Sequence, residues 1–275
     1  LLENTAREVA GSGGWAAVKT PQLHAMVRKY IDLYIRDEIP GYEEKSARFR
    51  YLFGRLRTTA EDIVDRMAEE LAESDFKPMA FELGFGADGQ LPAVTIREAG
   101  EELRVVGKVD RVDGWLKDGK LYLRVVDYKT GTKKLDLKEV YCGLDCQMLL
   151  YLFSLTRDKS GRFTGAEPAG VLYLLADPAP ETTTREKAAH SVEYKLDGLV
   201  RDEQKLFDAM DADETGRYLP FSYYKGAPSP YQKDKRADIA KLNRIQLHLD
   251  DLVTRMGQQL YEGQIAAEPL VTGRS

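Results

Sequence analysis

The sequence has few cysteines and no long apolar run, and both absences exclude classes of protein. Its 275 residues include two cysteines, Cys142 and Cys146. Two are too few for the disulfide framework of a small secreted domain, so a reducing, cytoplasmic compartment is expected. No stretch of about 18 apolar residues occurs, which excludes a transmembrane helix. A charged and then apolar leader is also missing, so no signal peptide is predicted.

The chain also has no excess of positive charge. Forty Lys and Arg residues stand against 45 Asp and Glu residues, which gives a net charge of -5. This balance argues against a wholly basic nucleic-acid coat but permits a local basic groove. The pattern G-x-x-x-x-G-K-[ST] is absent, so no ATP-driven motor is expected in this chain. The first residue is Leu1 rather than Met, which suggests a piece of a longer protein.

Hydrophobic periodicity divides the chain into three parts. Residues 1–78 have a helical pattern that Pro40-Gly41 interrupts. In residues 79–185 the period changes to two, which predicts strands, and a helix is expected from Asp136 to about Leu155. Residues 186–275 are predicted to be mostly loop up to about Pro230, followed by a helix over roughly 237–261. We expect one compact α/β or α+β domain in which helices flank a sheet.

The two longest predicted strands are joined by a tight turn. Asp118-Gly119 is a strong signal for a two-residue hairpin, because both central positions of that turn need φ > 0. In this register paired residue numbers sum to 237, so Asp110 is expected opposite Asp127, and Lys108 opposite Lys129. Alternation places Asp110, Val112, Asp127 and Lys129 on one face of the hairpin.

Two facing aspartates repel each other, and partial burial increases that cost. A divalent cation would offset it, and carboxylate oxygens suit Mg²⁺ or Mn²⁺. The backbone carbonyl of Tyr128 is a further candidate ligand. Lys129, two residues after Asp127, is placed to orient a water nucleophile and to stabilise charge on a phosphorane. The alternative for any single aspartate is a surface ion pair with Lys108 or Lys129.

The helix after the hairpin contributes Gln147 and Tyr151, which are four residues apart and share one face. A Gln amide within an apolar stripe needs a hydrogen-bond partner, and near a metal both groups could contact a DNA phosphate or base. The alternative is a core helix that tolerates one Gln. Cys142 and Cys146 are predicted to be small core residues, because two thiols without further ligands cannot complete a zinc or iron–sulfur site.

These motifs resemble the RecB-type branch of the PD-(D/E)XK nuclease superfamily. The resemblance rests on residues 107–113 (GKVDRVD), 126–131 (VDYKTG) and 147–152 (QMLLYL), in the order the family has them. It continues through residues 82–86 (ELGFG), 139–141 (EVY), 168–173 (PAGVLY) and the final helix. This wider match is similar to the C-terminal nuclease domain of the B subunits of AddAB-type helicase–nucleases.

The resemblance implies a restriction-endonuclease-like fold with a mixed central sheet and added N- and C-terminal helical segments. It also implies a metal-dependent DNA exonuclease that acts beside an AddA-like partner subunit in double-strand-break processing for homologous recombination. Asp110 and Asp127 would hold Mg²⁺, Lys129 would be the catalytic lysine, and Gln147 and Tyr151 the supporting third motif. Glu82 lies in a family-like segment, where a metal role and an exposed strand Glu are equally compatible.

The sequence departs from the family in two respects. Family members commonly carry a histidine metal ligand just before the position of Leu1, and none of His24, His190 and His248 lies in that context. They also commonly bind a [4Fe–4S] cluster through one upstream and three C-terminal cysteines, which this chain lacks. We therefore expect a nuclease domain trimmed inside its cluster-binding ends, with an incomplete metal shell.

Three classes of function remain open. The first is an active phosphodiesterase, and the second is a catalytically silent nuclease-fold module that binds DNA or a partner subunit. The third is a structural Ca²⁺ site in an interaction domain, which Lys129 disfavours because a second cation there is an electrostatic cost.

Two basic stretches are candidate phosphate contacts, although a solvated face is the common explanation of such runs. Tyr223, Tyr224 and Tyr231 are candidates for base stacking, with packing as the alternative. The basic residues are Lys129, Lys133, Lys134 and Lys138 in the first stretch, and Lys225, Lys233, Lys235, Arg236, Lys241 and Arg244 in the second.

Overall fold

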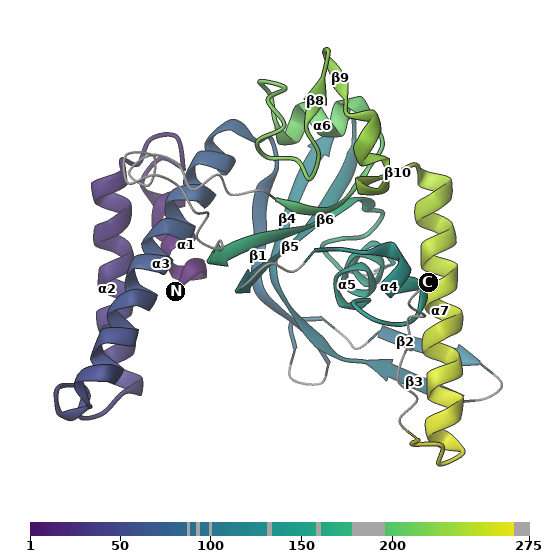
Figure 1. Ribbon diagram of the computed structural model, residues 1–275, viewed down its shortest axis with the longest axis horizontal. Helices are drawn as coiled ribbons and strands as arrows, with labels where there is room; N and C mark the ends of the chain where they lie inside the picture. Colours follow the sequence, from purple (N-terminus) through teal and green to yellow (C-terminus); the bar gives the residue numbers. More distant parts are fainter. Residues whose placement is uncertain are drawn as a thin grey trace, which may run out of the picture.

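A computed structural model describes residues 1–86, 89–91, 94–98, 101–130, 134–157, 161–177 and 196–266. Its centre is a six-stranded mixed sheet with the strand order β1-β4-β5-β6-β7-β10, and helices lie on both sides of it (Figure 1). The β5–β6 and β7–β10 pairs are parallel, and the other three pairs are antiparallel. The predicted α/β class with a mixed central sheet is thus confirmed.

The central sheet is accompanied by two small two-stranded sheets, β2-β3 and β8-β9. The strands are β1 (Lys77–Phe85), β2 (Val94–Glu98), β3 (Glu101–Val105), β4 (Gly107–Lys117), β5 (Lys120–Thr130), β6 (Glu167–Asp177), β7 (Asp197–Arg201), β8 (Tyr223–Tyr224), β9 (Ala227–Pro228) and β10 (Arg236–Ala237).

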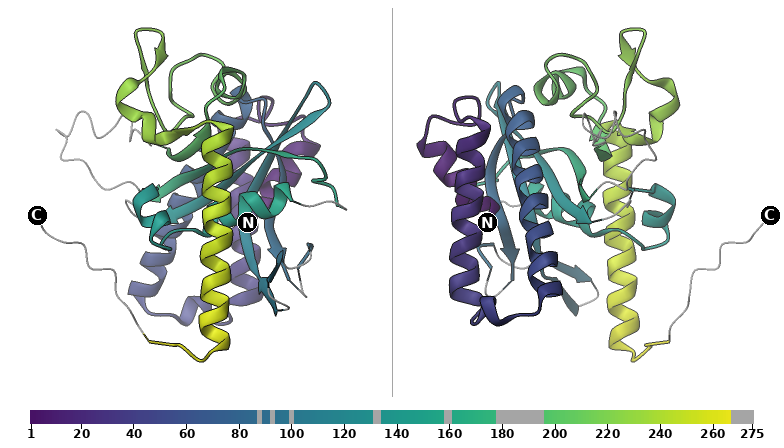
Figure 2. Two further views of the ribbon diagram at one scale, coloured as in Figure 1. Left: turned by 90° about the vertical axis from the view of Figure 1, so that its right-hand side faces the viewer. Right: turned by 60° about the vertical axis from the view of Figure 1, so that its left-hand side comes forward.

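The helices form two groups on either side of the sheet. They are α1 (Leu2–Gly11), α2 (Thr20–Glu38), η1 (Tyr42–Glu44), α3 (Ala47–Glu73), α4 (Leu137–Tyr141), α5 (Gln147–Thr156), α6 (Gln204–Met210), η2 (Pro230–Lys235) and α7 (Ile239–Tyr261). The first three α-helices pack together at one side of the molecule, and α7 runs along the opposite side (Figure 2). One sheet face packs against α4, α5 and α7, and the other packs against α6.

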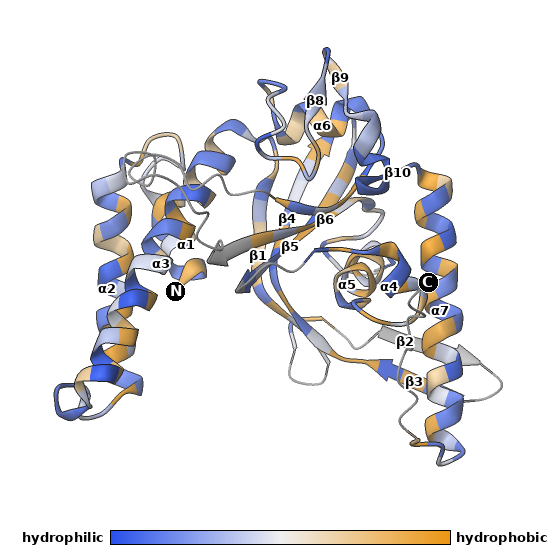
Figure 3. Ribbon diagram, in the orientation of Figure 1, coloured by the Kyte–Doolittle hydropathy of each residue, from blue (hydrophilic) through white to orange (hydrophobic). Residues whose placement is uncertain are grey.

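Local sequence signals explain where the long helices begin. Ser46 caps α3 by accepting a hydrogen bond from the backbone N–H of Phe49, and Asp238 caps α7 in the same way through Lys241. Pro21 lies in the first turn of α2, where its missing N–H costs nothing. Hydrophobic and hydrophilic residues alternate along α2, α3 and α7 (Figure 3), so each helix has an apolar face to bury.

The hairpin follows the predicted register over most of its length. Asp118 and Gly119 both have positive φ values, 51° and 75°. Pairs from Lys117↔Lys120 to Arg111↔Val126 all sum to 237. The ladder ends there, one pair before Asp110 would meet Asp127.

The single helix expected from Asp136 to Leu155 is wrong, because the chain turns between two shorter helices, α4 and α5. Gly143 and Asp145 both have positive φ values between them, 85° and 52°, a conformation that no helix interior contains. The break separates the two cysteines. Cys146 is buried, as predicted, whereas Cys142 is exposed, so its assignment to the core is wrong.

The segment expected to be mostly loop before Pro230 contains regular structure. β7 pairs with β6 and β10 inside the central sheet, and α6 packs on the second sheet face. Lys133, a candidate phosphate contact, and His190 lie outside the described residues. In the part of the chain that the structure describes, no helix is both long and apolar enough to cross a membrane.

Candidate functional site

Asp110 lies at the point where the β4–β5 ladder stops, and its carboxylate replaces the next ladder bond. Asp110 Oδ2 accepts a hydrogen bond of 3.0 Å from the backbone N–H of Tyr128. Burial raises the pKa of Asp110; this hydrogen bond opposes the rise, and the charges of Asp127 and Glu82 add to it. Asp110 is therefore a half-buried carboxylate surrounded by other acids.

Strand alternation is interrupted beside Asp110. The register of β1 and β4 places Glu82 opposite Asp110, and Glu82 has a φ of 51°, a conformation uncommon for a residue with a side chain. Val109 and Val112, three residues apart on β4, pack in the same core cluster, although strict alternation would place them on opposite faces. Beside this interruption lies a pocket of about 230 Å³, lined by Leu1, Leu2, Glu3, Asn4, Phe81, Glu82 and Asp110.

Two ion pairs replace the predicted contact between Lys108 and Lys129. Lys108 pairs with the exposed carboxylate of Glu82, which raises the pKa of the lysine. The Lys129 Nζ atom lies 2.6 Å from Asp127 Oδ2. That carboxylate oxygen is buried, and the Lys129 ammonium is the partner that the described part of the chain gives it. Asp127 and Lys129 thus form a close ion pair whose acidic partner is buried.

Tyr173 and Asp197 extend this site across the sheet. Tyr173 ends the family-like segment 168–173, but neither residue was predicted to belong to the site. Asp127 in β5 pairs with Tyr173 in β6, which pairs with Asp197 in β7, so their side chains share one face. Lys129 Nζ lies 5.9 Å from the centre of the Tyr173 ring. The Asp197 carboxylate accepts hydrogen bonds from Lys235 Nζ at 2.8 and 2.9 Å. Three side chains in register therefore continue the site from Asp127 toward η2.

Burial is the main reason that the pKa of Tyr173 is raised. The nearby carboxylate of Asp145, which accepts a hydrogen bond from the Tyr173 hydroxyl at 3.1 Å, raises it further. The charges of Asp127 and Asp197 act in the same direction. Tyr173 is therefore a neutral, hydrogen-bonded wall of the site.

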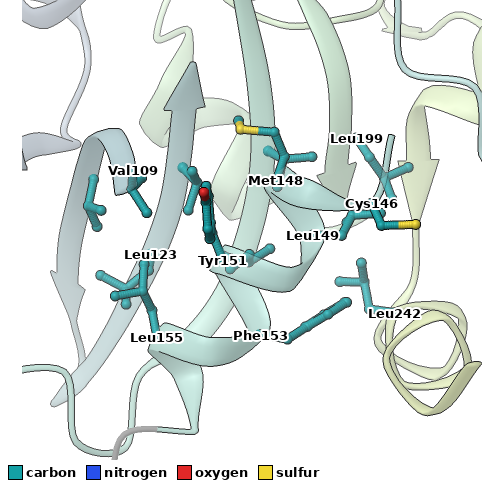
Figure 4. Close-up of a cluster of buried hydrophobic side chains, with 14 of the residues drawn as sticks. Val109, Leu123, Cys146, Met148, Leu149, Tyr151, Phe153, Leu155, Leu199 and Leu242 are labelled. Atoms are coloured by element: carbon teal, nitrogen blue, oxygen red, sulfur yellow. The ribbon is translucent and has the colours of Figure 1, made fainter. Parts of the chain in front are cut away.

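Gln147 and Tyr151 meet each other at the start of β4. The Tyr151 hydroxyl accepts hydrogen bonds from Gln147 Nε2 at 2.9 Å and from the backbone N–H of Lys108 at 3.1 Å. Tyr151 lies within the buried cluster beside Val109 and Leu123 (Figure 4). A Cβ atom at Gly107 would lie 2.4 Å from the Tyr151 hydroxyl, so only glycine fits there.

This pair is connected to the acids through the backbone of β4 rather than by direct contact. Among the described residues no hydrogen bond or ion pair joins Gln147 or Tyr151 to Asp110, Asp127 or Lys129. Gln147 is exposed, whereas Tyr151 is buried. The geometry therefore makes Tyr151 a support for the start of β4 and leaves Gln147 accessible from solvent.

A fully buried cluster of charges lies on the opposite face of the hairpin. Glu70 of α3 accepts a hydrogen bond of 3.0 Å from Arg111 and is also paired with Arg124. Asp113 Oδ2 accepts from Arg111 at 3.0 Å and from Arg124 at 2.9 Å. Although burial opposes its ionisation, the two guanidinium groups hold the pKa of Glu70 below its ordinary value. Two acids and two bases thus balance inside the protein.

Tyr128 connects this cluster with the site. Its backbone N–H holds Asp110, while its hydroxyl accepts a hydrogen bond of 3.1 Å from Arg111 on the opposite face. Burial raises the pKa of Tyr128 to about 12. The segment between Asp127 and Lys129 is therefore fixed from both faces of the sheet.

The donor set at Asp110 and Asp127 fits a hard divalent cation. It offers two carboxylates, one of which has a buried oxygen beside the Lys129 ammonium, and the backbone carbonyl of Tyr128 lies between Asp127 and Lys129. Within the described ranges no group of three or more His, Cys, Asp or Glu side chains is arranged to hold a metal. Mg²⁺ accepts such a set, because it commonly takes one or two carboxylates and completes its shell with water and substrate phosphates.

A [4Fe–4S] cluster does not fit this chain. Four cysteine thiolates are needed, and the sequence has two, of which one is exposed and the other is buried against the backbone carbonyls of Val140 and Leu144.

The fold is consistent with one class of nucleases. The model of the PD-(D/E)XK nuclease superfamily matches residues 12–270, and the chain belongs to this superfamily.

Three relatives of this chain share one name, the B subunit of an ATP-dependent helicase/deoxyribonuclease. The chain is 26% identical over 279 residues to the protein of Clostridium tetani, which covers 98% of the chain and 24% of that protein. It is 27% identical over 283 residues to the protein of Alkaliphilus oremlandii, covering 99% of the chain and 25% of that protein. It is 33% identical over 243 residues to the protein of Symbiobacterium thermophilum, covering 83% of the chain and 20% of that protein. The chain thus spans about a quarter or less of these relatives.

Proposed function

We propose that this chain is the nuclease domain of a helicase–nuclease B subunit. In this proposal it is a cytoplasmic, Mg²⁺- or Mn²⁺-dependent DNA exonuclease that works with an AddA-like partner subunit in recombinational repair of double-strand breaks. The superfamily and the names of the relatives support nuclease activity on DNA within a larger assembly. The observation that carries the proposal is the pair Asp127–Lys129, with a buried carboxylate oxygen 2.6 Å from the amine and Asp110 held beside it by Tyr128.

Each residue of the site receives a role in this proposal. Asp110, Asp127 and the carbonyl of Tyr128 would hold the cation, which would supply Lewis-acid chemistry at a phosphoryl oxygen. The Lys129 amine orients the attacking water and stabilises the negative charge that develops on the phosphorus oxygens. Gln147, which is exposed, contacts a DNA phosphate or base.

The remaining groups of the site position these residues. Tyr151 holds the Gln147 amide and the backbone of Lys108, and it therefore sets the direction in which β4 enters the site. The Tyr173 ring bounds the space in which the Lys129 amine can move, since the two lie 5.9 Å apart. Glu82 balances Lys108 and contributes negative charge near Asp110.

Removal of divalent metal tests the proposed function directly. The chain is expected to degrade linear duplex or single-stranded DNA in Mg²⁺ or Mn²⁺. Excess EDTA is expected to abolish cleavage, because two acidic side chains cannot bind a phosphate without a cation between them and it. Product release from end-labelled DNA measures the activity, and a circular single-stranded substrate separates exonuclease from endonuclease cleavage. Added Mn²⁺ should restore the activity.

Two results would contradict this proposal. Cleavage that persists in EDTA would exclude the metal site. Absence of cleavage in Mg²⁺ and in Mn²⁺, both by the chain alone and within the full-length protein with its partner, would instead favour a catalytically silent module that binds DNA or the partner subunit.

A further inference from the structure

A small lobe formed by β8, β9 and η2 exposes two aromatic rings. The side chain of Tyr231 is 83% exposed and that of Tyr224 is 50% exposed, and their ring centroids lie 6.3 Å apart in an edge-on arrangement. Between residues 196 and 238, a stretch that the structure describes in full, these are the large hydrophobic side chains that remain exposed. Exposed aromatic rings offer flat faces on which bases of any sequence can stack.

The lobe holds both rings on a fixed backbone. The Gln232 side chain accepts hydrogen bonds of 2.9 Å from both the N–H and the hydroxyl of Ser222, which joins η2 to the chain just before β8. Ser229, which is buried, caps η2 and donates its N–H to the Ser222 carbonyl at 2.8 Å. The two tyrosines are thus presented by a hydrogen-bonded hairpin and helix rather than by a loose loop.

The charges around the rings suit a polyanion. Lys225, at the turn between β8 and β9, places its ammonium 5.3 Å from the centre of the Tyr224 ring. Lys233 is exposed on η2, and Asp234 is the acid beside it. A lysine next to an exposed ring offers a contact for a phosphate, and the ring offers a stacking face for a neighbouring base.

The lobe is also connected to the site. Asp127, Tyr173 and Asp197 lie in register across three neighbouring strands, so Asp197 is roughly 10 Å from Asp127. Lys235, the last residue of η2, binds the Asp197 carboxylate. Tyr231 lies four residues before Lys235, which spans at most roughly 14 Å of chain. A DNA single strand bound on the lobe would therefore reach Asp110 and Asp127 within a few nucleotides.

We infer that Tyr224 and Tyr231, flanked by Lys225 and Lys233, form a stacking platform for the bases of single-stranded DNA outside the cleavage site. The inference rests on the proposed function, because it assumes that the chain handles DNA. Stacking requires unpaired bases, so the platform selects a single strand over a duplex. Each stacked ring contributes to affinity without regard to sequence.

The test measures binding without cleavage. A fluorescein-labelled dT20 oligonucleotide is titrated in EDTA with the Asp127→Asn variant, and fluorescence anisotropy gives Kd. Adding Tyr231→Ala is expected to weaken binding about five- to tenfold, because one base–aromatic stack is lost. Tyr231→Trp should retain the affinity. Tyr51→Ala on α3 and Tyr261→Ala on α7 remove rings that are 67% and 75% exposed elsewhere, and they should leave Kd unchanged.

An abasic oligonucleotide separates stacking from charge. The Tyr231→Ala effect should disappear on an abasic strand of the same length, whereas Lys225→Gln should weaken binding to both strands and lower the salt slope by about one. A blunt duplex should show less than a twofold effect of Tyr231→Ala.

Several outcomes overturn the inference while leaving the proposed function intact. One is an unchanged Kd for Tyr231→Ala on dT20 in a chain that still cleaves DNA. Another is an equal loss of affinity for dT20 and for the abasic strand in Tyr231→Ala. A third is normal DNA binding with lost association with the partner subunit, which would make the lobe a protein interface. Conversely, a stacking effect in a chain that never cleaves DNA would support the platform and reject the nuclease.

Discussion

Replacing Asp127 with asparagine is expected to lower the rate of DNA cleavage by roughly 10³-fold. Asparagine keeps the shape of the side chain but removes one of the two negative charges that would hold the cation, and the Lewis-acid contribution of such a cation is worth several kcal/mol. The buried Oδ2 oxygen 2.6 Å from Lys129 would also lose its charge, so the amine would no longer be held in place. Initial rates on end-labelled DNA in saturating Mg²⁺ measure the effect.

The hairpin itself provides a matched control. Asp118→Asn makes the same chemical change at the tip of the turn, where Asn tolerates the observed φ of 51°, and activity should stay within about twofold. The circular dichroism spectra of both variants should match that of the unchanged chain, which shows that each variant is folded. A tenfold or smaller loss in Asp127→Asn, at full metal saturation, would contradict the role of Asp127 as a metal ligand.

Replacing Glu70 with alanine is expected to destabilise the protein by about 3–5 kcal/mol. Two buried guanidinium groups would keep Asp113 as their shared acid, leaving one positive charge uncompensated inside the fold. Because Arg111 and Arg124 are both fully buried, water cannot take the place of the lost carboxylate. Urea denaturation followed by circular dichroism gives the free energy of unfolding.

The adjacent acid is the control for this change. Glu69 is exposed and pairs with Arg217 at the surface, so Glu69→Ala should change the free energy of unfolding by at most about 1 kcal/mol. A loss below about 1 kcal/mol in Glu70→Ala would show that the buried cluster is not a balanced unit. Charge balance would then no longer explain why four charges are buried beneath the site.

The hairpin register was predictable because one turn dictates it. Asp118-Gly119 fixes both strands, and the sum of 237 holds to Arg111↔Val126. The predicted next pair, Asp110 with Asp127, is not formed. The register rule assumes continuous pairing, and Asp110 instead uses its side chain to bind the Tyr128 N–H. The irregular backbone of Glu82 in the neighbouring strand, which no local pattern indicated, accompanies that change.

Other parts of the site depend on contacts between distant segments. Tyr173 and Asp197 reach Asp127 through the pairing of β5 with β6 and of β6 with β7, which sequence periodicity does not specify. Glu70 meets the hairpin through the packing of a helix that ends before β1. In contrast, the break between α4 and α5 had a signal in the sequence, since Gly143 and Asp145 are residue types that commonly adopt positive φ.

The most direct test of the central claim is the position of a bound metal. A crystal of the chain soaked in Mn²⁺ should show one anomalous peak between Asp110 and Asp127, roughly 2.0–2.2 Å from an oxygen of each, and the peak should be absent from Asp127→Asn. An anomalous peak elsewhere, or none at a Mn²⁺ concentration that supports cleavage, would contradict the account.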